Sequence, residues 1–279
     1  MNDPEKTPGP KRPGPEKMAA TAHFDAGAAW NAATRLLRAN RSVLPVLAGL
    51  FFFVPQVLLT ALVPDVPADL EGEAAAQAAL DIFADWFALI FAVTLVQAMG
   101  MIAIAALLAD RTRPTVREAM GKALRMLPTY VAAAMVVIAG IGLFALMILL
   151  PLTIVMGEGG AAIALVPIFA AAVWVNVRTL VLVPVICAEG LRNPFDALKR
   201  TWALTTGRGA RMLLVLVLFV IAALVISIIT TVVPGSLLIA ALGLDTGRAI
   251  VGLIEGAVSA ALIMVWTALI VAIHAQIAR

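Results

Sequence analysis

The sequence of 279 residues contains few of the side chains from which catalytic and metal sites are built. Its single cysteine, Cys187, excludes an internal disulfide bond and a cysteine-rich metal site. Its two histidines, His23 and His274, have no second histidine or carboxylate at ligand spacing, so we expect no metal site. A G-x-S-x-G motif, a phosphate-binding loop and a pair of catalytic carboxylates are also missing, so we expect no cofactor and no enzymatic activity.

Charged residues are also scarce. They make up 13% of the chain against about 25% in soluble domains, whereas hydrophobic residues reach 62% against about 45–50%. The charges collect between apolar runs that are each long enough to cross a hydrocarbon core of about 30 Å as a helix. Runs this long and continuous are typical of helices and not of barrel strands. The sequence therefore predicts an all-α polytopic membrane protein with six transmembrane helices, at Val43–Val63, Trp86–Ala109, Pro128–Met156, Ala161–Cys187, Met212–Val233 and Ala249–Ile273.

The chain begins with a proline-rich segment. Residues 1–18 contain five prolines and two glycines but no apolar run, so they cannot bury enough surface to fold alone. We predict a disordered tail at residues 1–22 and a six-helix transmembrane domain at residues 23–279. Because no apolar signal-peptide segment follows the charges of the tail, we expect the first transmembrane helix to act as an uncleaved insertion signal.

Lysine and arginine gather on alternate loops. Seven precede the first span, five lie at residues 110–127 and five at residues 188–211, whereas the opposite face has only Arg248. This asymmetry predicts that the tail and both termini face the cytoplasm, in a bacterial inner membrane. The first loop on the opposite face is acidic, from Asp65 to Asp85, and its spacing matches no calcium-binding loop. We expect a solvated loop with a short helix there.

The longest polar passage between spans, Asn193–Arg211, predicts a basic amphipathic helix on the membrane surface. Asn193 can cap the helix and Pro194 suits its first position. Phe195, Leu198 and Trp202 form its apolar stripe.

Two further surface helices are predicted, so that each pair of spans has one before it. One begins at Thr115 with a T-x-x-E capping box, and the other carries Ala26, Trp30, Ala33 and Leu37 on one face. Phe24-Asp25-Ala26 recurs as Phe195-Asp196-Ala197. The pattern favours a threefold internal repeat of surface helix, span and span, with chance similarity of hydropathy as the alternative.

Residues 177–207 read VRTLVLVPVICAEGLRNPFDALKRTWALTTG. This passage resembles the signature of the membrane domain of glycerophosphoryl diester phosphodiesterases and of the related YciC-like bacterial integral membrane proteins. The matching positions are Arg178, Pro184, Glu189, Gly190, Trp202 and Gly207, and Thr201 stands where the group often has serine. The resemblance implies a membrane module alone, because catalysis in two-part members belongs to a separate soluble barrel that has no counterpart here.

Three polar residues fall inside predicted spans. Arg178 is expected near the inner interface, where it either snorkels to lipid phosphates or lines a polar cavity with Asn176. Glu255 is expected about 9 Å below the opposite edge, in structural polar contact or in a proton-coupled transport role. Gly252 and Gly256 form G-x-x-x-G, which favours close helix packing inside the monomer over dimerisation.

The cations around the Asn193–Arg211 passage are the strongest functional lead. Each lysine or arginine near an anionic leaflet contributes on the order of 1 kcal/mol of attraction. Candidate ligands for lipid headgroups are therefore Arg178, Arg192, Lys199, Arg200, Arg208 and Arg211. The alternative is that these cations only orient the chain during insertion.

Three functions remain open at this point. The first is a non-enzymatic inner-membrane protein that binds or organises anionic phospholipids in envelope homeostasis. The second is a small-solute transporter or channel lined by Asn176, Arg178 and Glu255. The third is an assembly partner for another membrane protein. No feature indicates nucleic-acid binding, and the sequence does not indicate the oligomeric state.

Overall fold

The computed structural model describes residues 24–67, 69–109 and 114–278. These residues form only helices and their connections. The predicted disordered tail lies outside the described residues. The elements in chain order are α2 (Ala26–Ala39), α3 (Leu44–Ala48), η1 (Gly49–Phe53), α4 (Val54–Leu62), α5 (Gly72–Ala109), α6 (Val116–Met156), α7 (Glu158–Thr179), α8 (Leu182–Glu189), α9 (Pro194–Thr205), α10 (Gly209–Ser227), η2 (Ile228–Val232), α11 (Val233–Leu242) and α12 (Leu244–Ile277).

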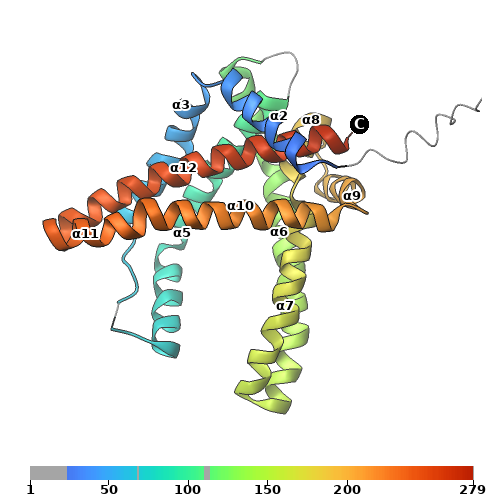
Figure 1. Cartoon of the computed structure of the whole chain (residues 1–279). Helices are drawn as coiled ribbons and strands as arrows, with labels where there is room; N and C mark the ends of the chain where they lie inside the picture. Colours follow the sequence, from blue (N-terminus) through green and yellow to red (C-terminus); the bar gives the residue numbers. More distant parts are fainter. Residues whose placement is uncertain (1–23, 68, 110–113, 279) are drawn as a thin grey trace, which may run out of the picture.

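The prediction of an all-α polytopic membrane protein is confirmed. Among the described residues, six helical segments are long and apolar enough to cross a membrane. They are Leu44–Leu62, Gly72–Ala109, Val116–Met156, Gly159–Glu189, Gly209–Leu242 and Thr246–Ile277. They pair as three helical hairpins: α3 to α4 with α5, α6 with α7, and α10 to α11 with α12 (Figure 1).

Several helices run further than the apolar runs that predicted them. α5 begins at Gly72, so part of the acidic loop is helical and continuous with the second span. The surface helix predicted at Thr115 is the first part of α6 and runs straight into the third span. Its capping box is present, since the Thr115 hydroxyl accepts from the Glu118 N–H and the Glu118 carboxylate accepts from the Thr115 N–H. Polar residues continue a helix outside the bilayer, so hydropathy does not mark where such a helix ends.

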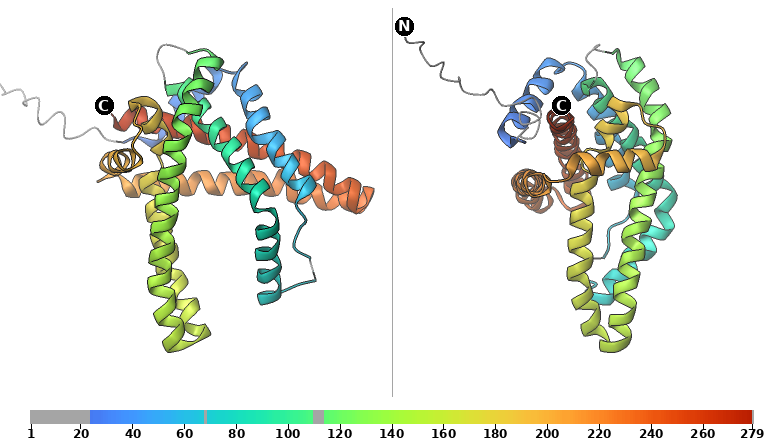
Figure 2. Two further views of the ribbon diagram at one scale, coloured as in Figure 1. Left: turned by 180° about the vertical axis from the view of Figure 1, so that it is seen from behind. Right: turned by 90° about the vertical axis from the view of Figure 1, so that its right-hand side faces the viewer.

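The buried side chains concentrate at one end of the molecule, which we call the hub. Three buried segments form its centre: Ile102–Leu108 of α5, Val181–Cys187 before and within α8, and Ala268–Ile273 of α12. The surface helix α2 packs against α12 through Ala29 and Ala33. The hub therefore joins all three hairpins and lies where α2 packs against the last part of α12 (Figure 2).

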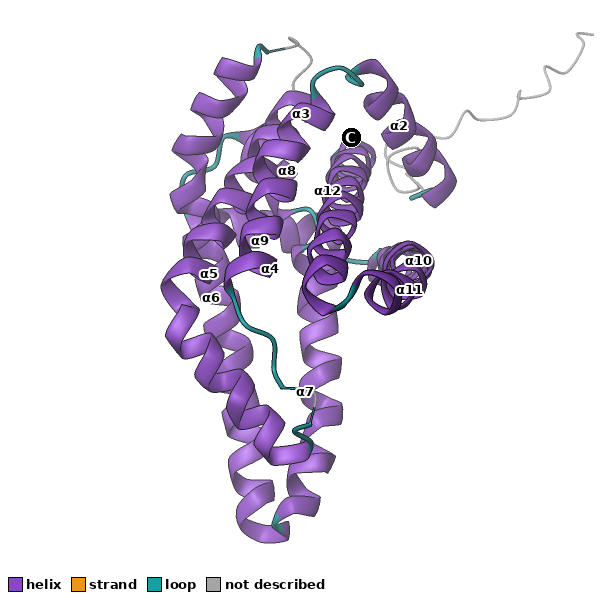
Figure 3. Cartoon of the chain, turned by 90° about the vertical axis from the view of Figure 1, so that its left-hand side faces the viewer, coloured by secondary structure: helices purple, strands orange, loops and turns teal. Residues whose placement is uncertain are grey.

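Away from the hub the hairpins diverge. In Figure 1, α6 and α7 run down the view together, whereas α10, α11 and α12 run across it. Figure 3 shows the same divergence, with α10 and α11 seen end-on at the right and the upright α6 at the left. The outer parts expose large apolar side chains, such as Met147 and Ile154 on α6 and Phe169 on α7. Apolar surface of this extent requires lipid or another apolar partner around it.

Two spans contain a π-helical turn directly before a Val-Pro pair. η1 precedes Val54-Pro55, and η2 precedes Val233-Pro234. Proline has no N–H to donate, and its ring collides with the carbonyl of the preceding turn, so a locally wider turn lets the helix continue past it. The hydropathy pattern predicts an end of the fifth span at Val233, but α11 continues to Leu242 for this reason.

In the first and third units of the predicted repeat, the first span therefore contains a π turn followed by a Val-Pro pair. The first span of the middle unit, α6, has neither feature. The short Phe-Asp-Ala match is less informative. Asp25 is the N-cap of α2, whereas Asp196 lies inside the first turn of α9. The threefold repeat stays a prediction.

The G-x-x-x-G glycines of α12 pack inside the chain, as expected. A Cβ atom added at Gly252 would lie 2.9 Å from the Thr60 side chain, and one at Gly256 would lie 3.1 Å from the Val57 side chain. These contacts hold the first and third hairpins together. The close approach is possible because neither glycine has a side chain.

We predict that Gly256→Leu lowers the thermal stability of the purified protein in detergent, by about 1–3 kcal/mol from overpacking against Val57 and Phe53. Gly142→Leu is the matched control, because a Cβ at Gly142 meets nothing within 4 Å. Both substitutions gain the same helix propensity, so the difference in unfolding temperature reports the contact. Equal unfolding temperatures for the two variants would contradict intramolecular packing.

Candidate functional site

The basic surface helix α9 begins as the sequence predicts. The Asn193 Oδ1 accepts from the Phe195 N–H at 3.0 Å, and Pro194 occupies the first turn, where its missing N–H leaves no intrahelical bond unmade. The preceding loop is tied to α6, because the Thr129 hydroxyl donates to the Arg192 carbonyl at 2.9 Å. α9 therefore has a defined position against the hub.

α9 turns its small side chains, and not its apolar stripe, towards the hub. Ala197, Thr201, Leu204 and Thr205 are buried. The two threonine hydroxyls donate to backbone carbonyls one turn earlier, so their burial leaves no polar group unpaired. The stripe of Phe195, Leu198 and Trp202 lies outside this buried face.

The predicted apolar stripe of α9 is not the face that the hub buries. Phe195 is 56% exposed, and Leu198 and Trp202 are only partly buried. In the same way Trp30 of α2, predicted to share a face with Ala33, is 51% exposed. Both surface helices therefore present an aromatic residue outwards, where a membrane interface accommodates tryptophan well.

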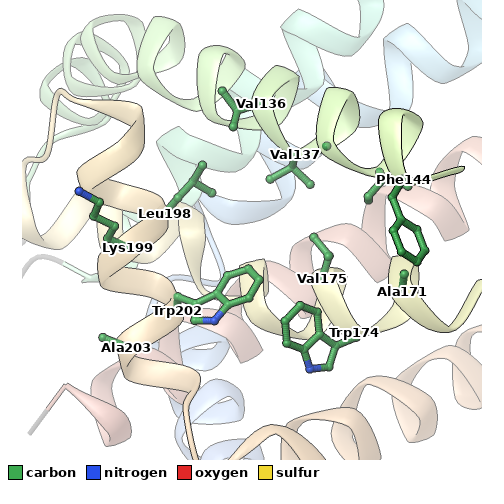
Figure 4. A pocket seen from close by; sticks show the side chains of 12 residues that line it. Val136, Val137, Phe144, Ala171, Trp174, Val175, Leu198, Lys199, Trp202 and Ala203 are labelled. Atoms are coloured by element: carbon green, nitrogen blue, oxygen red, sulfur yellow. The ribbon is translucent and has the colours of Figure 1, made fainter. Parts of the chain in front are cut away.

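A cavity of about 760 Å³ lies between α9 and the α6–α7 hairpin (Figure 4). Its walls are almost entirely apolar, and Lys199 is the charged residue among them. Figure 4 places Lys199 on the α9 side, with its amine directed away from the two tryptophan rings. The lining comprises Val136, Val137, Gly140, Ile141, Phe144, Ala171, Trp174, Val175, Leu198, Lys199, Trp202 and Ala203.

Arg178 of α7 contacts α9 beside this cavity. Its guanidinium carbon lies 5.4 Å from the ring centroid of Trp174 and 5.6 Å from that of Trp202. The two rings meet edge to face, with centroids 4.8 Å apart. Arg178 also donates to the Thr206 hydroxyl at 3.2 Å. The arrangement joins cation–π attraction to an aromatic contact, at the C-terminal end of α7 where a cation is favoured.

A second link joins α8 to α9. α8 ends at Glu189, and Gly190 adopts the left-handed conformation, with φ of 66°, that glycine adopts most readily at a helix C-terminus. The Arg200 Nε lies 2.9 Å from both Glu189 carboxylate oxygens. The Nε2 of His274, on α12, lies 4.0 Å from the same carboxylate. Glu189 therefore meets side chains from two other helices, although its pairing with the half-exposed Arg200 is only modestly stabilising.

The remaining predicted headgroup ligands have different surroundings. The Arg208 guanidinium donates to the Leu204 carbonyl at 3.2 Å, within its own turn. The Arg211 guanidinium donates to the Phe24 carbonyl at 3.5 Å and so contacts the start of α2. Arg192 is exposed at the beginning of α9. Among the six predicted cations, Lys199 lines the cavity and Arg178 contacts two of its lining tryptophans, whereas Arg200 is engaged by Glu189.

The predicted family residues also have local structural roles. Pro184 is buried in α8, Gly207 has a φ of 76° in the turn that follows α9, and Trp202 contacts Trp174. Trp174 is the important residue that sequence reasoning missed. Its spacing of four residues before Arg178 could have revealed it, because side chains at i and i+4 of a helix are neighbours.

The three predicted intramembrane polar residues are not brought together. Asn176 borders a separate cavity of about 290 Å³ together with Tyr130 and Thr179. Glu255 is exposed on α12 and lines neither the cavity beside α9 nor the one beside Asn176. Arg178 faces the two tryptophans.

We predict that Arg178→Gln lowers the free energy of unfolding in detergent by about 1–2 kcal/mol, through loss of the cation–π contacts. Arg178→Lys should recover only part of this loss, because an ammonium group cannot stack as a planar guanidinium does. Arg35→Gln, at an exposed position of α2, removes the same charge elsewhere. A stability change for Arg178→Gln no larger than that of the control would contradict this role.

Comparisons of the chain with protein-family models, curated proteins and solved structures gave no match.

Proposed function

We propose that this multi-pass membrane protein binds anionic phospholipid through the surface of α9 and has no enzymatic activity of its own. The observation that carries the proposal is the orientation of α9. Its alanine and threonine face packs on the hub, while Phe195 and Lys199 are exposed and Leu198 and Trp202 are only partly buried beside the cavity. A helix used only to cover a protein core would bury its apolar stripe.

The side chains of α9 suit the boundary between lipid and water. Tryptophan is enriched at that boundary because its ring is apolar and its N–H is polar. Lys199 is exposed on α9, and Arg192 is exposed in the loop before it. Cations at this depth attract acidic headgroups, each by about 1 kcal/mol. The proposal therefore places α9 along the cytoplasmic surface of the bacterial inner membrane, with both termini on that side.

The resemblance to the phosphodiesterase membrane domain and the YciC-like proteins is part of the same proposal. It is supported by the structural roles of the matching residues, since Glu189 pairs with Arg200 of α9, Gly190 ends α8 and Gly207 lies in the turn after α9.

The transport alternative has weaker support. A transporter needs polar residues that converge on one water-accessible cavity. Asn176, Arg178 and Glu255 have different surroundings among the described residues. The assembly-partner alternative would use the exposed apolar surface of the outer hairpins, but no described residue there indicates a particular partner.

We predict that Lys199→Gln weakens binding of phosphatidylglycerol by about fivefold, as loss of one interfacial cation of about 1 kcal/mol implies. Binding of phosphatidylcholine should not change, because that headgroup carries no net charge. Native mass spectrometry of gently extracted protein measures both. Arg35→Gln is the control for loss of a cation elsewhere. If Lys199→Gln retains the wild-type preference for phosphatidylglycerol, the proposed function fails.

The proposed orientation predicts which engineered cysteines react from outside. In a Cys187→Ala background, a membrane-impermeant maleimide added to intact spheroplasts should label Val66→Cys, in the connection between α4 and α5. The same reagent should label Lys199→Cys only after the membrane is opened. Labelling of Lys199→Cys in intact spheroplasts would reverse the orientation.

A further inference from the structure

If α9 bound only the headgroup of a lipid, the cavity between α9 and the α6–α7 hairpin would have no function. We infer that it receives one acyl chain of an anionic phospholipid whose headgroup is held by Lys199. This inference rests on the proposed function and assigns it a specific site. The lipid would thus be bound singly, with one chain enclosed by protein, and not merely attracted to a charged surface.

The shape of the cavity comes from small residues on each of its three helices. Gly140 of α6, Ala171 of α7 and Ala203 of α9 all line it. A Cβ atom added at Gly140 would meet nothing within 4 Å, so the space at this position is open. The volume of about 760 Å³ lies within the range of about 300–1,000 Å³ that is usual for small-ligand sites.

The residues that line the cavity indicate which class of molecule would bind there. Phe144, Val136 and the two tryptophans offer apolar surface, which favours a hydrocarbon over any hydrated solute. A cation at only one side favours a molecule with one negative end. Charge complementarity and an apolar interior together describe an anionic amphiphile.

The position of the cavity selects phospholipid among anionic amphiphiles. It lies between the spans α6 and α7 and the surface helix α9, whose stripe faces outwards. Lining residues such as Val136 and Phe144 are partly exposed at the surface of the spans. A chain that leaves the bilayer could therefore enter the cavity while its headgroup stays beside α9.

The wild-type arrangement offers a direct optical test. Trp174 and Trp202 line the cavity, and the other tryptophans are Trp30, Trp86 and Trp266. In a variant with those three replaced by Phe, titration with phosphatidylglycerol brominated on one acyl chain should quench the remaining fluorescence saturably. Phosphatidylcholine with the same brominated chain should quench at about tenfold higher concentration or more, because it lacks the attraction to Lys199 and Arg178.

A pair of variants tests whether the chain enters. Gly140→Phe fills the cavity, whereas Gly142→Phe adds the same side chain to the same helix at a position that does not line it. In the reporter background, Gly140→Phe should weaken quenching by phosphatidylglycerol about tenfold, because methylenes excluded from an apolar site lose their burial. Gly142→Phe should bind as the reporter does. Ala171→Leu narrows the cavity from α7 and replaces Gly140→Phe if that variant does not fold.

The outcomes separate this site from the proposed function. If Lys199→Gln weakens phosphatidylglycerol binding but Gly140→Phe and Ala171→Leu do not, α9 binds headgroups and the acyl-chain site is wrong. If none of the three weakens it, both proposals fail. Equal quenching by the two brominated lipids would show an apolar site without headgroup selection and would also overturn the inference.

Discussion

The structure depends on the difference between packing in water and packing in lipid. In the hydrocarbon region each helix satisfies its own backbone hydrogen bonds, and lipid tails contact apolar side chains about as well as another helix does. Extended burial is therefore not needed along the whole length of a span. Here it is concentrated in the hub, where α5, α8 and α12 contribute consecutive buried residues and the surface helices close over them. The parts of the hairpins that lie away from the hub keep exposed apolar side chains, which a membrane environment would cover.

Hydropathy predicted the six spans because long apolar runs have few alternatives. It did not predict the beginning of α5 at Gly72 or the fusion of the middle surface helix, which begins at Thr115, with α6, since polar residues continue a helix in water. It also stopped the fifth span before Pro234, because a proline normally ends a helix unless a local widening such as η2 accommodates it. The divergence of the hairpins depends on contacts between helices that are far apart in the sequence. Hydropathy is read over short stretches of sequence, so it does not predict such contacts.

The candidate site was only partly predictable for a related reason. The cap at Asn193, the first-turn proline and the cations follow from local rules, and the structure has the predicted cap and helix start. α9 turns Ala197 and Thr201 inwards, because their small side chains allow close packing. The stripe of large apolar residues lies on another part of the helix, so the sequence pattern did not predict this orientation. The pairing of Glu189 with Arg200 joins two helices across a loop, and the contact of Trp174 with Trp202 joins a span, α7, to the surface helix α9. Contacts of this kind require the fold.

The packing of α2 against α12 has a consequence for biogenesis. α2 is the first described helix and α12 the last, and the Phe24 carbonyl accepts from Arg211 near the start of α10. During translation, α2 is therefore made long before its neighbour emerges from the ribosome. Its outward Trp30 and its arginines suit a position on a membrane surface until the last span is inserted. Completion of the hub is thus the closing event of assembly, and a chain truncated before Ala268 would have every earlier span but no finished core.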